Sequence, residues 1–258
     1  MIEVHNLTFG YSSTEDGQIL KGVDFAAKTG KLTALIGTNG AGKSTLLKTI
    51  MGILKGKGAI TINGKSVAEY STKDFSSTVS YLSQDNDCRV NLTVFEVVML
   101  GRMGSMSFRV SDEDIAATQE VLERLNLQRF ASRSIMELSG GQRQLVFMAQ
   151  ALVKEPKILI LDEPTSALDL HKQFDLLTLL KNLTQENDFT TLVTLHHLDL
   201  AAMFADEIIV LKEGRVYAQG VPKDIFTEAM MEDVYRVKTK IYMDDKGMPH
   251  VIPLEAIN

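Results

Sequence analysis

The sequence of 258 residues predicts an α/β protein with a mostly parallel central sheet. Four short apolar runs support this prediction, at residues 32–36, 79–82, 158–161 and 190–195. Runs of this length without polar alternation are typical of strands buried on both faces, as in a parallel sheet covered by helices. A Gly or polar residue follows each run at once. Because ligands of open α/β sheets bind beyond the carboxyl ends of the strands, these endings predict a shared site.

Helical patterns separate the apolar runs. Between residues 43 and 54, four apolar side chains recur on one side, and a second such group stands before Pro156. These two groups are Leu46, Leu47, Ile50 and Ile53, and Leu145, Met148, Ala149 and Leu152. Residues 208–220 and 237–254 each read as strand, Gly-containing turn and strand.

The stretch between residues 85 and 138 has a different sequence pattern from the rest of the chain, and it predicts a small inserted helical part. Residues 91–101 and 111–127 have helical patterns. Ser111 and Asp114 form a capping pair at the start of the second pattern, which directs Ile115, Leu122 and Leu125 inward.

Composition narrows the class of protein. The chain is 45% hydrophobic, enough for a sizeable core, and its formal net charge of −6 argues against a protein that wraps duplex nucleic acid. No apolar run reaches the roughly 18 residues of a membrane span, and the first residues lack a secretory pattern, so we expect a cytoplasmic protein. The single cysteine, Cys88, is read as an incidental thiol.

Residues 37–45 read GTNGAGKST and contain the phosphate-loop pattern GxxxxGKS after a predicted strand and before a predicted helix. Glycines let the backbone wrap closely around a phosphate, with N–H groups and a positive helix end turned toward the anion. Lys43 would reach the β and γ phosphates of a nucleoside triphosphate, and the Ser44 hydroxyl would bind Mg²⁺.

Two acidic residues follow the apolar run 158–161 and so emerge at the same sheet edge. Asp162 suits the coordination shell of Mg²⁺, and Glu163 suits the general base that activates water.

Two adjacent histidines, His196 and His197, follow the run 190–195. The doublet alone leaves two interpretations open. Either one imidazole acts in the site, or both histidines are only polar residues where the chain leaves the core. Successive side chains at a strand end point apart, so only one of them is expected to face the site. A metal site made by both histidines with Asp199 is a weaker alternative.

A second helix start suited to an anion lies in MELSGGQRQ, residues 136–144. Ser139 is a good helix cap, and Gly140 and Gly141 leave backbone N–H groups unobstructed. Because one triphosphate already occupies the helix of Lys43, this second start needs another phosphate group or the nucleotide of another protomer.

With LSGGQ at 138–142 and DEPTSALD at 162–169, the sequence resembles the ATP-binding cassette (ABC) family over almost its whole length. The resemblance implies a P-loop NTPase cassette with a mostly parallel core, an N-terminal antiparallel β part and an inserted helical subdomain. We expect one domain over 1–258, with the nucleotide-binding core at 1–84 and 156–220, the helical subdomain at 85–155 and a tail at 221–258. The resemblance to the ABC family also implies a head-to-tail dimer that sandwiches two ATP molecules between its subunits.

Several residue roles follow from this resemblance. Tyr11 would stack on adenine, Gln84 would sense Mg²⁺ and the membrane partner, and His196 would bond the γ phosphate, with His197 a departure from the frequent Asp. Thr38, where Pro is frequent, is a further departure. Catalysis is assigned to Glu163 and His196, and metal binding to Ser44, Gln84 and Asp162. The expected ATP contacts are Tyr11, Gly37, Thr38, Asn39, Gly40, Ala41, Gly42, Lys43, Ser44, Thr45, Gln84, Ser139, Gly140, Gly141, Gln142 and Asp169.

Within the family, Gly101–Arg102, the segment after the His doublet and the tail resemble the ATPase subunits of importers for iron-siderophores, haem and cobalamin. Met103, Gly104 and Ser105 depart from the Pro and His usual there. The resemblance implies peripheral attachment to the cytoplasmic face of the membrane through permease subunits, which would contact residues 85–103, and an indirect link to an extracytoplasmic substrate-binding protein. The alternatives are an importer ATPase for another substrate, a soluble ABC ATPase of DNA repair, translation or cluster assembly, and a kinase or GTPase.

Overall fold

The strands that the sequence predicts are present in the computed structural model, which describes residues 1–12, 17–84, 91–102 and 110–257. The four apolar runs form β3 (Lys31–Ile36), β6 (Val79–Leu82), β7 (Ile158–Leu161) and β8 (Thr190–Thr194). The chain divides into two compact units. The first consists of Met1–Glu69 and Leu180–Asn258, and the second of Tyr70–Leu179. Helix α6 (Leu170–Glu186) runs across this boundary. The subdivision expected from the sequence stays a prediction.

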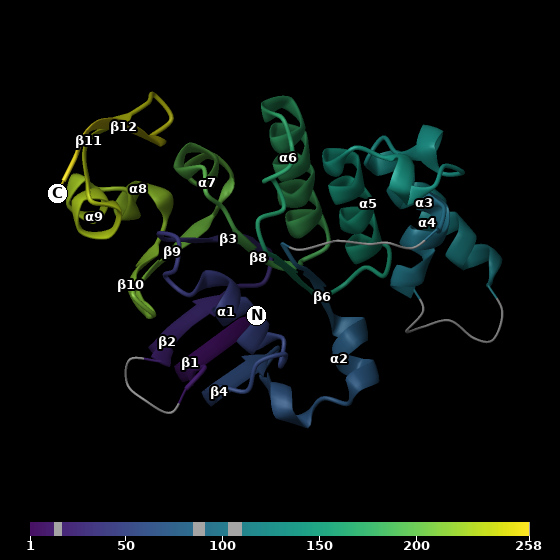
Figure 1. Cartoon of the computed structure of the whole chain (residues 1–258), viewed down its shortest axis with the longest axis horizontal. Helices are drawn as coiled ribbons and strands as arrows, with labels where there is room; N and C mark the ends of the chain where they lie inside the picture. Colours follow the sequence, from purple (N-terminus) through teal and green to yellow (C-terminus); the bar gives the residue numbers. More distant parts are fainter. Residues whose placement is uncertain (13–16, 85–90, 103–109, 258) are drawn as a thin grey trace. The chain divides into compact units, whose positions relative to one another are not determined.

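The first unit contains an antiparallel sheet of order β2-β1-β4-β5. Its strands are β1 (Ile2–Gly10), β2 (Gln18–Ala27), β4 (Lys57–Ile62) and β5 (Lys65–Ser66), and η2 (Val67–Glu69) follows. Strands β1, β2 and β4 lie side by side in Figure 1. Their buried side chains alternate, with Ile2 and Val4 fully buried and Glu3 less so, as expected for a sheet with one covered face.

The same unit contains the parallel strands β8, β3 and β9 (Glu207–Lys212), with β10 (Arg215–Gly220) antiparallel at the edge. Strands β3 and β8 are buried along almost their whole length, which is why they read as apolar runs. The remaining elements of this unit are α1 (Lys43–Ile50), α7 (Leu198–Phe204), α8 (Pro222–Ile225), α9 (Glu228–Met230), the π-helix η6 (Met231–Tyr235), β11 (Val237–Met243) and β12 (Pro249–Ala256). Both strand-turn-strand predictions are confirmed.

The second unit pairs β6 and β7 in parallel. Its further elements are α2 (Thr72–Thr78), α3 (Val94–Met99), η3 (Leu100–Arg102), α4 (Asp112–Arg124), η4 (Gln128–Phe130), η5 (Ile135–Glu137) and α5 (Gly140–Leu152). Helices α3, α4 and α5 pack against one another (Figure 1). Helix α3 begins later than predicted because Thr93 and Glu96 form a capping box, which places residues 91 and 92 before the helix.

Two predictions for helical side chains are wrong, the place of Ile53 in the helical pattern 43–54 and the inward direction of Ile115. Helix α1 ends at Ile50 because Gly52 adopts a left-handed conformation, and Ile53 beyond it is 59% exposed. On α4 the buried stripe begins at Asp114, so Ile115 beside it is 36% exposed, whereas Leu122 and Leu125 are buried as predicted. No helix among the described residues is long and apolar enough to span a membrane.

Candidate functional site

The phosphate loop connects β3 to α1 within the first unit. Gly37, Gly40 and Gly42 all have positive φ angles, of 148°, 79° and 103°. At Gly37 a Cβ atom would collide with the backbone carbonyl of Leu211, so this position requires glycine. Gly42 precedes α1 without a side-chain cap, and the first turn of α1 carries no acidic residue. The uncapped N–H groups and positive end of this helix therefore suit an anion.

Lys43 is 7% exposed and bonded to its own loop. Its Nζ donates to the carbonyl oxygens of Gly37, at 2.8 Å, and Thr38, at 3.1 Å. These contacts satisfy a buried ammonium group, whose burial without partners would be costly. To reach phosphate oxygens, the ammonium group must exchange these carbonyls for the anion.

His196 follows β8 at the sheet edge where the phosphate loop follows β3. The pairing of Leu35 with Thr194 brings the carboxyl ends of these two parallel strands to one level. Both His196 and His197 are exposed, and His197 precedes α7 without making a side-chain cap. The described residues contain no group of three His, Cys, Asp or Glu that could hold a metal ion.

Tyr11 directly follows β1 and is 70% exposed. Its ring meets that of Phe9 edge to face, with 5.0 Å between the ring centroids. An exposed aromatic face held in this way is suited to stacking on a flat base.

In the second unit, the ends of β6 and β7 bring Gln84, Asp162 and Glu163 together. Leu82 pairs with Leu161, and the backbone N–H of Asp162 donates to the Leu82 carbonyl at 2.8 Å. The Gln84 side-chain amide then donates to the carboxylate of Glu163, also at 2.8 Å. Asp162 is only 1% exposed.

Glu163 has a φ of 52°, a left-handed conformation that costs free energy for a residue other than glycine. Such conformations persist where the surroundings hold them, and they gather at active sites.

Ser139 caps α5, as the sequence predicts. Its hydroxyl accepts from the Gln142 N–H at 3.3 Å, and the Gln142 side chain accepts in return from the Ser139 N–H at 2.9 Å. A Cβ at Gly140 would meet open space, whereas one at Gly141 would lie 2.8 Å from the Ala167 carbonyl oxygen. Gly140 thus leaves the helix start accessible, while Gly141 allows close packing on the loop that precedes α6.

Asp169 lies in that loop and binds Lys172 twice. One carboxylate oxygen accepts from the Lys172 N–H at 3.0 Å, and the other lies 2.9 Å from Lys172 Nζ. The hydrogen bonds from Lys172 lower the pKa of Asp169 below its ordinary value, so this exposed carboxylate is charged at neutral pH.

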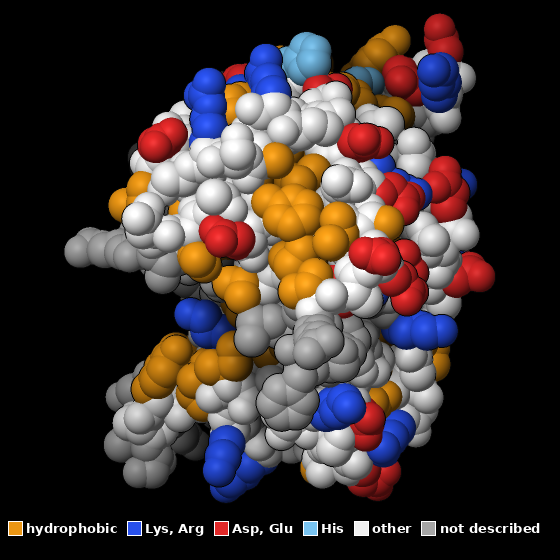
Figure 2. Space-filling view, turned by 90° about the vertical axis from the view of Figure 1, so that its right-hand side faces the viewer, with side chains coloured by type: hydrophobic (Ala, Val, Ile, Leu, Met, Phe, Trp, Pro, Cys, Tyr) orange, Lys and Arg blue, Asp and Glu red, His pale blue; other side chains and the backbone are white. Residues whose placement is uncertain are grey.

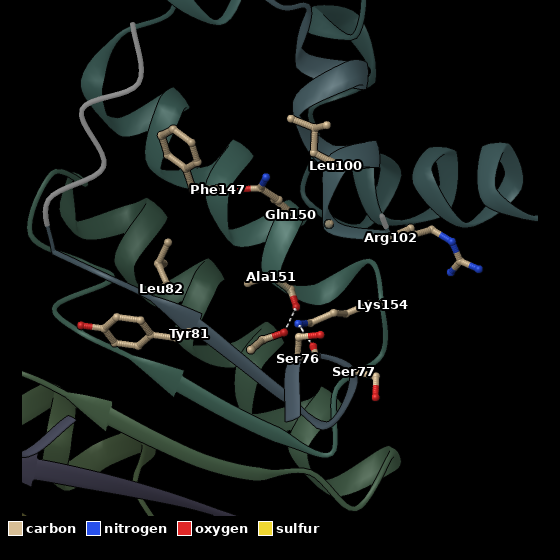
Figure 3. Close-up of a pocket in the computed structure, with 12 residues that line it drawn as sticks. Ser76, Ser77, Tyr81, Leu82, Leu100, Arg102, Phe147, Gln150, Ala151 and Lys154 are labelled. Carbon is tan, nitrogen blue, oxygen red and sulfur yellow. Dashed lines mark hydrogen bonds between the residues drawn. The ribbon is translucent and has the colours of Figure 1, made fainter. Parts of the chain in front are cut away.

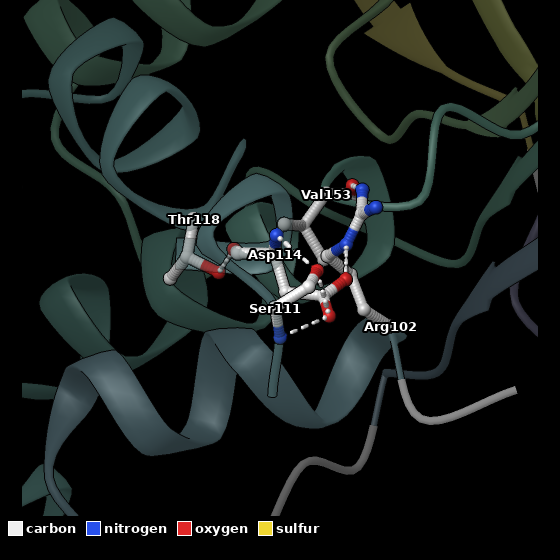
Figure 4. Close-up of polar contacts among 5 residues, drawn as sticks. All are labelled: Arg102, Ser111, Asp114, Thr118 and Val153. Atoms are coloured by element: carbon white, nitrogen blue, oxygen red, sulfur yellow. Dashed lines mark hydrogen bonds and ion pairs between the residues drawn. The ribbon is translucent and has the colours of Figure 1, made fainter. Parts of the chain in front are cut away.

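An ion pair that sequence reasoning missed joins Arg102 to Asp114 (Figure 4). Arg102 Nε donates to Asp114 at 2.6 Å, and another guanidinium nitrogen donates to the Val153 carbonyl at 3.1 Å. The second carboxylate oxygen of Asp114 accepts from the N–H and hydroxyl of Ser111. Together the Arg102 and Ser111 hydrogen bonds lower the pKa of Asp114 to about 2. One guanidinium group thereby ties the ends of η3 and α5 to the start of α4.

Arg102 also lines a cavity of about 370 Å³ within the second unit (Figure 3). Apolar side chains line part of it, and the ammonium group of Lys154 reaches across to the carbonyls of Ser76 and Val79. Burial lowers the pKa of Lys154. The cavity is lined by Ser76, Ser77, Ser80, Tyr81, Leu82, Leu100, Gly101, Arg102, Phe147, Gln150, Ala151 and Lys154, with no carboxylate among them.

Further support for the phosphate loop was also missed from the sequence. The Gly214 N–H in the β9–β10 turn donates to the Ala41 carbonyl at 3.1 Å. Gly214, with a φ of 79°, was visible only as a turn residue. Cys88 and residues 103–105 lie outside the described residues, as do residues 85–90 of the segment 85–103 expected to contact a permease.

These features define a P-loop nucleotide-binding protein. They are a buried strand, a glycine-rich loop, an uncapped helix and an acidic pair at the end of another strand. Residues 20–166, more than half of the chain, match the family model described as ABC transporter. The chain therefore belongs to the ABC transporter family, and it is an ATPase.

Three comparisons illustrate the resemblance. The iron(3+)-hydroxamate import ATP-binding protein FhuC of Bacillus subtilis (strain 168) is 37% identical over 248 residues, covering 95% of this chain and 91% of that protein. A solved structure described as an inward-facing metal-chelate type ABC transporter has a TM-score of 0.82 at 28% identity, covering 98% of this chain and 97% of that one. The ATP-binding cassette MJ0796, a dimer bound to ADP and Pi in a post-hydrolysis state, has a TM-score of 0.78 at 30% identity, covering 86% and 98%.

Proposed function

We propose that this chain binds and hydrolyses ATP to power the import of a metal chelate, such as an iron-siderophore, haem or cobalamin, through a separate membrane permease. The hydrogen bond between Gln84 and Glu163 carries the proposal, because it joins the hydrolytic carboxylate to the strand whose Tyr81 and Leu82 line the cavity. The import relative and the metal-chelate type neighbour support the substrate class.

In the proposed reaction, Lys43 leaves the loop carbonyls and binds the β and γ phosphates. Glu163 accepts a proton from the attacking water, and His196 bonds the γ phosphate. Tyr11 stacks on the adenine ring. His197, at the start of α7, takes no part.

Ser44, Gln84 and Asp162 supply oxygen atoms from a hydroxyl, an amide and a carboxylate, a donor set that suits Mg²⁺. Because the Gln84 nitrogen is bonded to Glu163, its carbonyl oxygen is the atom left for the ion. Bound Mg²⁺ would neutralise phosphate charge in the transition state.

Two copies of the chain would form a head-to-tail dimer. The exposed helix start at Ser139 and Gly140 would meet the γ phosphate held on the other copy, and Asp169 would lie at the same interface. The dimeric cassette among the solved neighbours supports this arrangement. The start of α5 is accessible and suits an anion, but it is not part of the phosphate loop. A nucleotide bound to a second protomer would supply that anion.

The cavity beside Leu100 and Arg102 is the proposed docking site for a cytoplasmic segment of the permease. Leu100 is exposed and lines the cavity. Figure 2, seen from the side on which α3 and α4 are drawn in Figure 1, shows apolar side chains gathered at the centre of a face and charged ones around them. Exposed apolar patches rimmed by charge are typical of protein-binding surfaces. Docking here would hold the chain at the cytoplasmic face of the membrane.

Uptake of ⁵⁵Fe-loaded hydroxamate siderophore, haem and labelled cobalamin by cells lacking the chain tests the transport role. Wild-type chain is expected to restore uptake of one of them, and Glu163→Gln is expected to fail although it accumulates normally. Unchanged uptake of all three in the deletion cells would contradict the metal-chelate class.

Membrane attachment tests the docking site separately. Leu100→Glu is expected to move the chain from the membrane fraction to the soluble fraction while ATP binding remains. Ile115→Glu, an exposed apolar residue of α4 that does not line the cavity, is the matched control. Loss of membrane association in both variants, or in neither, would contradict the assignment of this cavity.

A further inference from the structure

The second unit contains another cavity, of about 260 Å³, lined by residues from the end of α4, from η4, from α5 and from α6. On α6, Lys172, Leu176 and Leu179 recur at helical spacing and so lie on one side of the helix. None of the residues assigned to catalysis or to Mg²⁺ lines this cavity, which is named the Arg129 cavity after one residue that does.

Apolar side chains form a large part of the lining of the Arg129 cavity. They are Leu125, Leu127, Phe130, Leu145, Leu176 and Leu179. Leu127 and Leu176 are each only 2% exposed, whereas Leu145 and Leu179 are half-buried. Such walls favour an apolar group that leaves water. A volume just below the range of about 300 to 1,000 Å³ typical of drug-sized ligands suits a smaller molecule.

The charged lining residues are mostly cationic. Arg124, Arg129 and Lys172 line the cavity, and the carboxylate of Asp175 is the only one among its lining residues. That carboxylate lies 2.9 Å from Nδ1 of His171, which also lines the cavity. The positive charges therefore outnumber the negative ones, and the cavity favours an anion.

Arg129 is the cation best placed to receive that anion. Its guanidinium group lies over the ring of Phe130, with 4.7 Å from Cζ to the ring centroid, and it forms no ion pair within the described part of the chain. Stacking on the ring holds the planar guanidinium group beside the apolar lining. Its N–H donors match the two oxygens of a carboxylate.

The other two cations have exposed partners. Arg124 lies 2.7 Å from Glu120, and Lys172 lies 2.9 Å from Asp169. Ion pairs between exposed side chains contribute little to stability, so either cation can turn to a bound anion at small cost.

We propose that the Arg129 cavity binds a small amphipathic carboxylate, with its apolar body against the leucines and Phe130 and its carboxylate on Arg129. Such a ligand would also compete with Asp169 for the ammonium group of Lys172. Binding at this cavity needs neither nucleotide nor permease, so its test is separate from that of the proposed import role.

Octanoate is the probe, titrated calorimetrically into the full chain at fixed ionic strength. We expect a Kd of about 0.1 to 1 mM, as for a ligand of roughly ten non-hydrogen atoms. Octanol, which has the same chain without the charge, should bind at least about fivefold more weakly. No octanoate binding below about 10 mM, or equal binding of octanol, would overturn the proposal.

Arg129→Gln is expected to weaken octanoate binding about fivefold or more and to leave octanol binding unchanged. Arg133→Gln is the matched control, because the Arg133 guanidinium group lies 5.3 Å from the same ring but does not line the cavity. An unchanged octanoate Kd in Arg129→Gln, or an equal loss in both variants, would overturn the proposal.

Leu179→Trp tests the apolar part of the cavity. A larger side chain at this half-buried position fills the space and should abolish octanoate binding. Full binding in a folded Leu179→Trp variant would place octanoate elsewhere and contradict the proposal. If this variant does not fold, Arg129→Gln decides, because Arg129 is exposed and its replacement leaves the core intact.

Discussion

The side-chain amide of Gln84 donates a 2.8 Å hydrogen bond to the carboxylate of Glu163. Gln84 follows β6, and Glu163 follows the paired strand β7 in a left-handed conformation. The bond orients this carboxylate from the neighbouring strand. Movement of the segment after β6 would therefore act directly on Glu163.

Replacing Gln84 by Ala is expected to lower ATP hydrolysis by about 10-fold and leave the Kd for ATP within about threefold, because the carboxylate stays but loses its orienting partner. Steady-state phosphate release and equilibrium ATP binding measure the two effects. Gln119→Ala, an exposed glutamine on α4, is the control. Full activity in the Gln84 variant would show that this bond does not orient the base.

Replacing Glu163 by Gln is expected to keep ATP binding and lower hydrolysis by roughly 10²-fold or more, the usual scale for loss of a general base. The trapped ATP should then stabilise a dimer, visible by gel filtration. Glu155→Gln is a matched control, because Glu155 is an exposed glutamate with a similar positive φ of 50°. Near-normal turnover in Glu163→Gln would remove this residue from its role.

The two histidines are expected to behave differently. His196→Ala should abolish most hydrolysis because a γ-phosphate contact is lost, while His197→Ala should leave turnover within about twofold. Both side chains are exposed, so neither change creates a core cavity, and melting temperatures should be similar. Turnover of both variants at saturating ATP decides the matter, and the reverse ranking would overturn the assignment.

The Arg102–Asp114 pair predicts a contribution to acid stability. The folded pKa of Asp114 is about 2, below its ordinary value of 3.8, so its stabilisation is fully present above about pH 4. That stabilisation is lost as the pH falls from about 4 to about 2, where the folded carboxylate takes up a proton. Asp114→Asn should therefore be less stable at pH 7 and lose less stability across that interval.

Urea unfolding at a series of pH values measures this difference. Asp112→Asn, an exposed acid of the same first turn, controls for the change in helix charge. Parallel pH profiles for wild type and Asp114→Asn would show that the ion pair does not contribute to folding.

The sequence by itself determined the features that depend on neighbouring residues. Each buried strand appeared as an apolar run, and the phosphate loop and the Ser139 cap were visible because their chemistry lies within a few residues of chain. Glu163 was placed at a strand end by the same local logic, although its left-handed backbone was not predicted.

Tertiary structure alone decided the pairings of residues far apart in the sequence. On α4 it is Asp114, not Ile115, that is buried, and its carboxylate accepts hydrogen bonds from Arg102 and Ser111. The hydrogen bond from Gly214 to Ala41 joins residues far apart in the sequence, and no periodicity or spacing encodes it. Such contacts form only when packing brings their elements together, so they were absent from any local pattern.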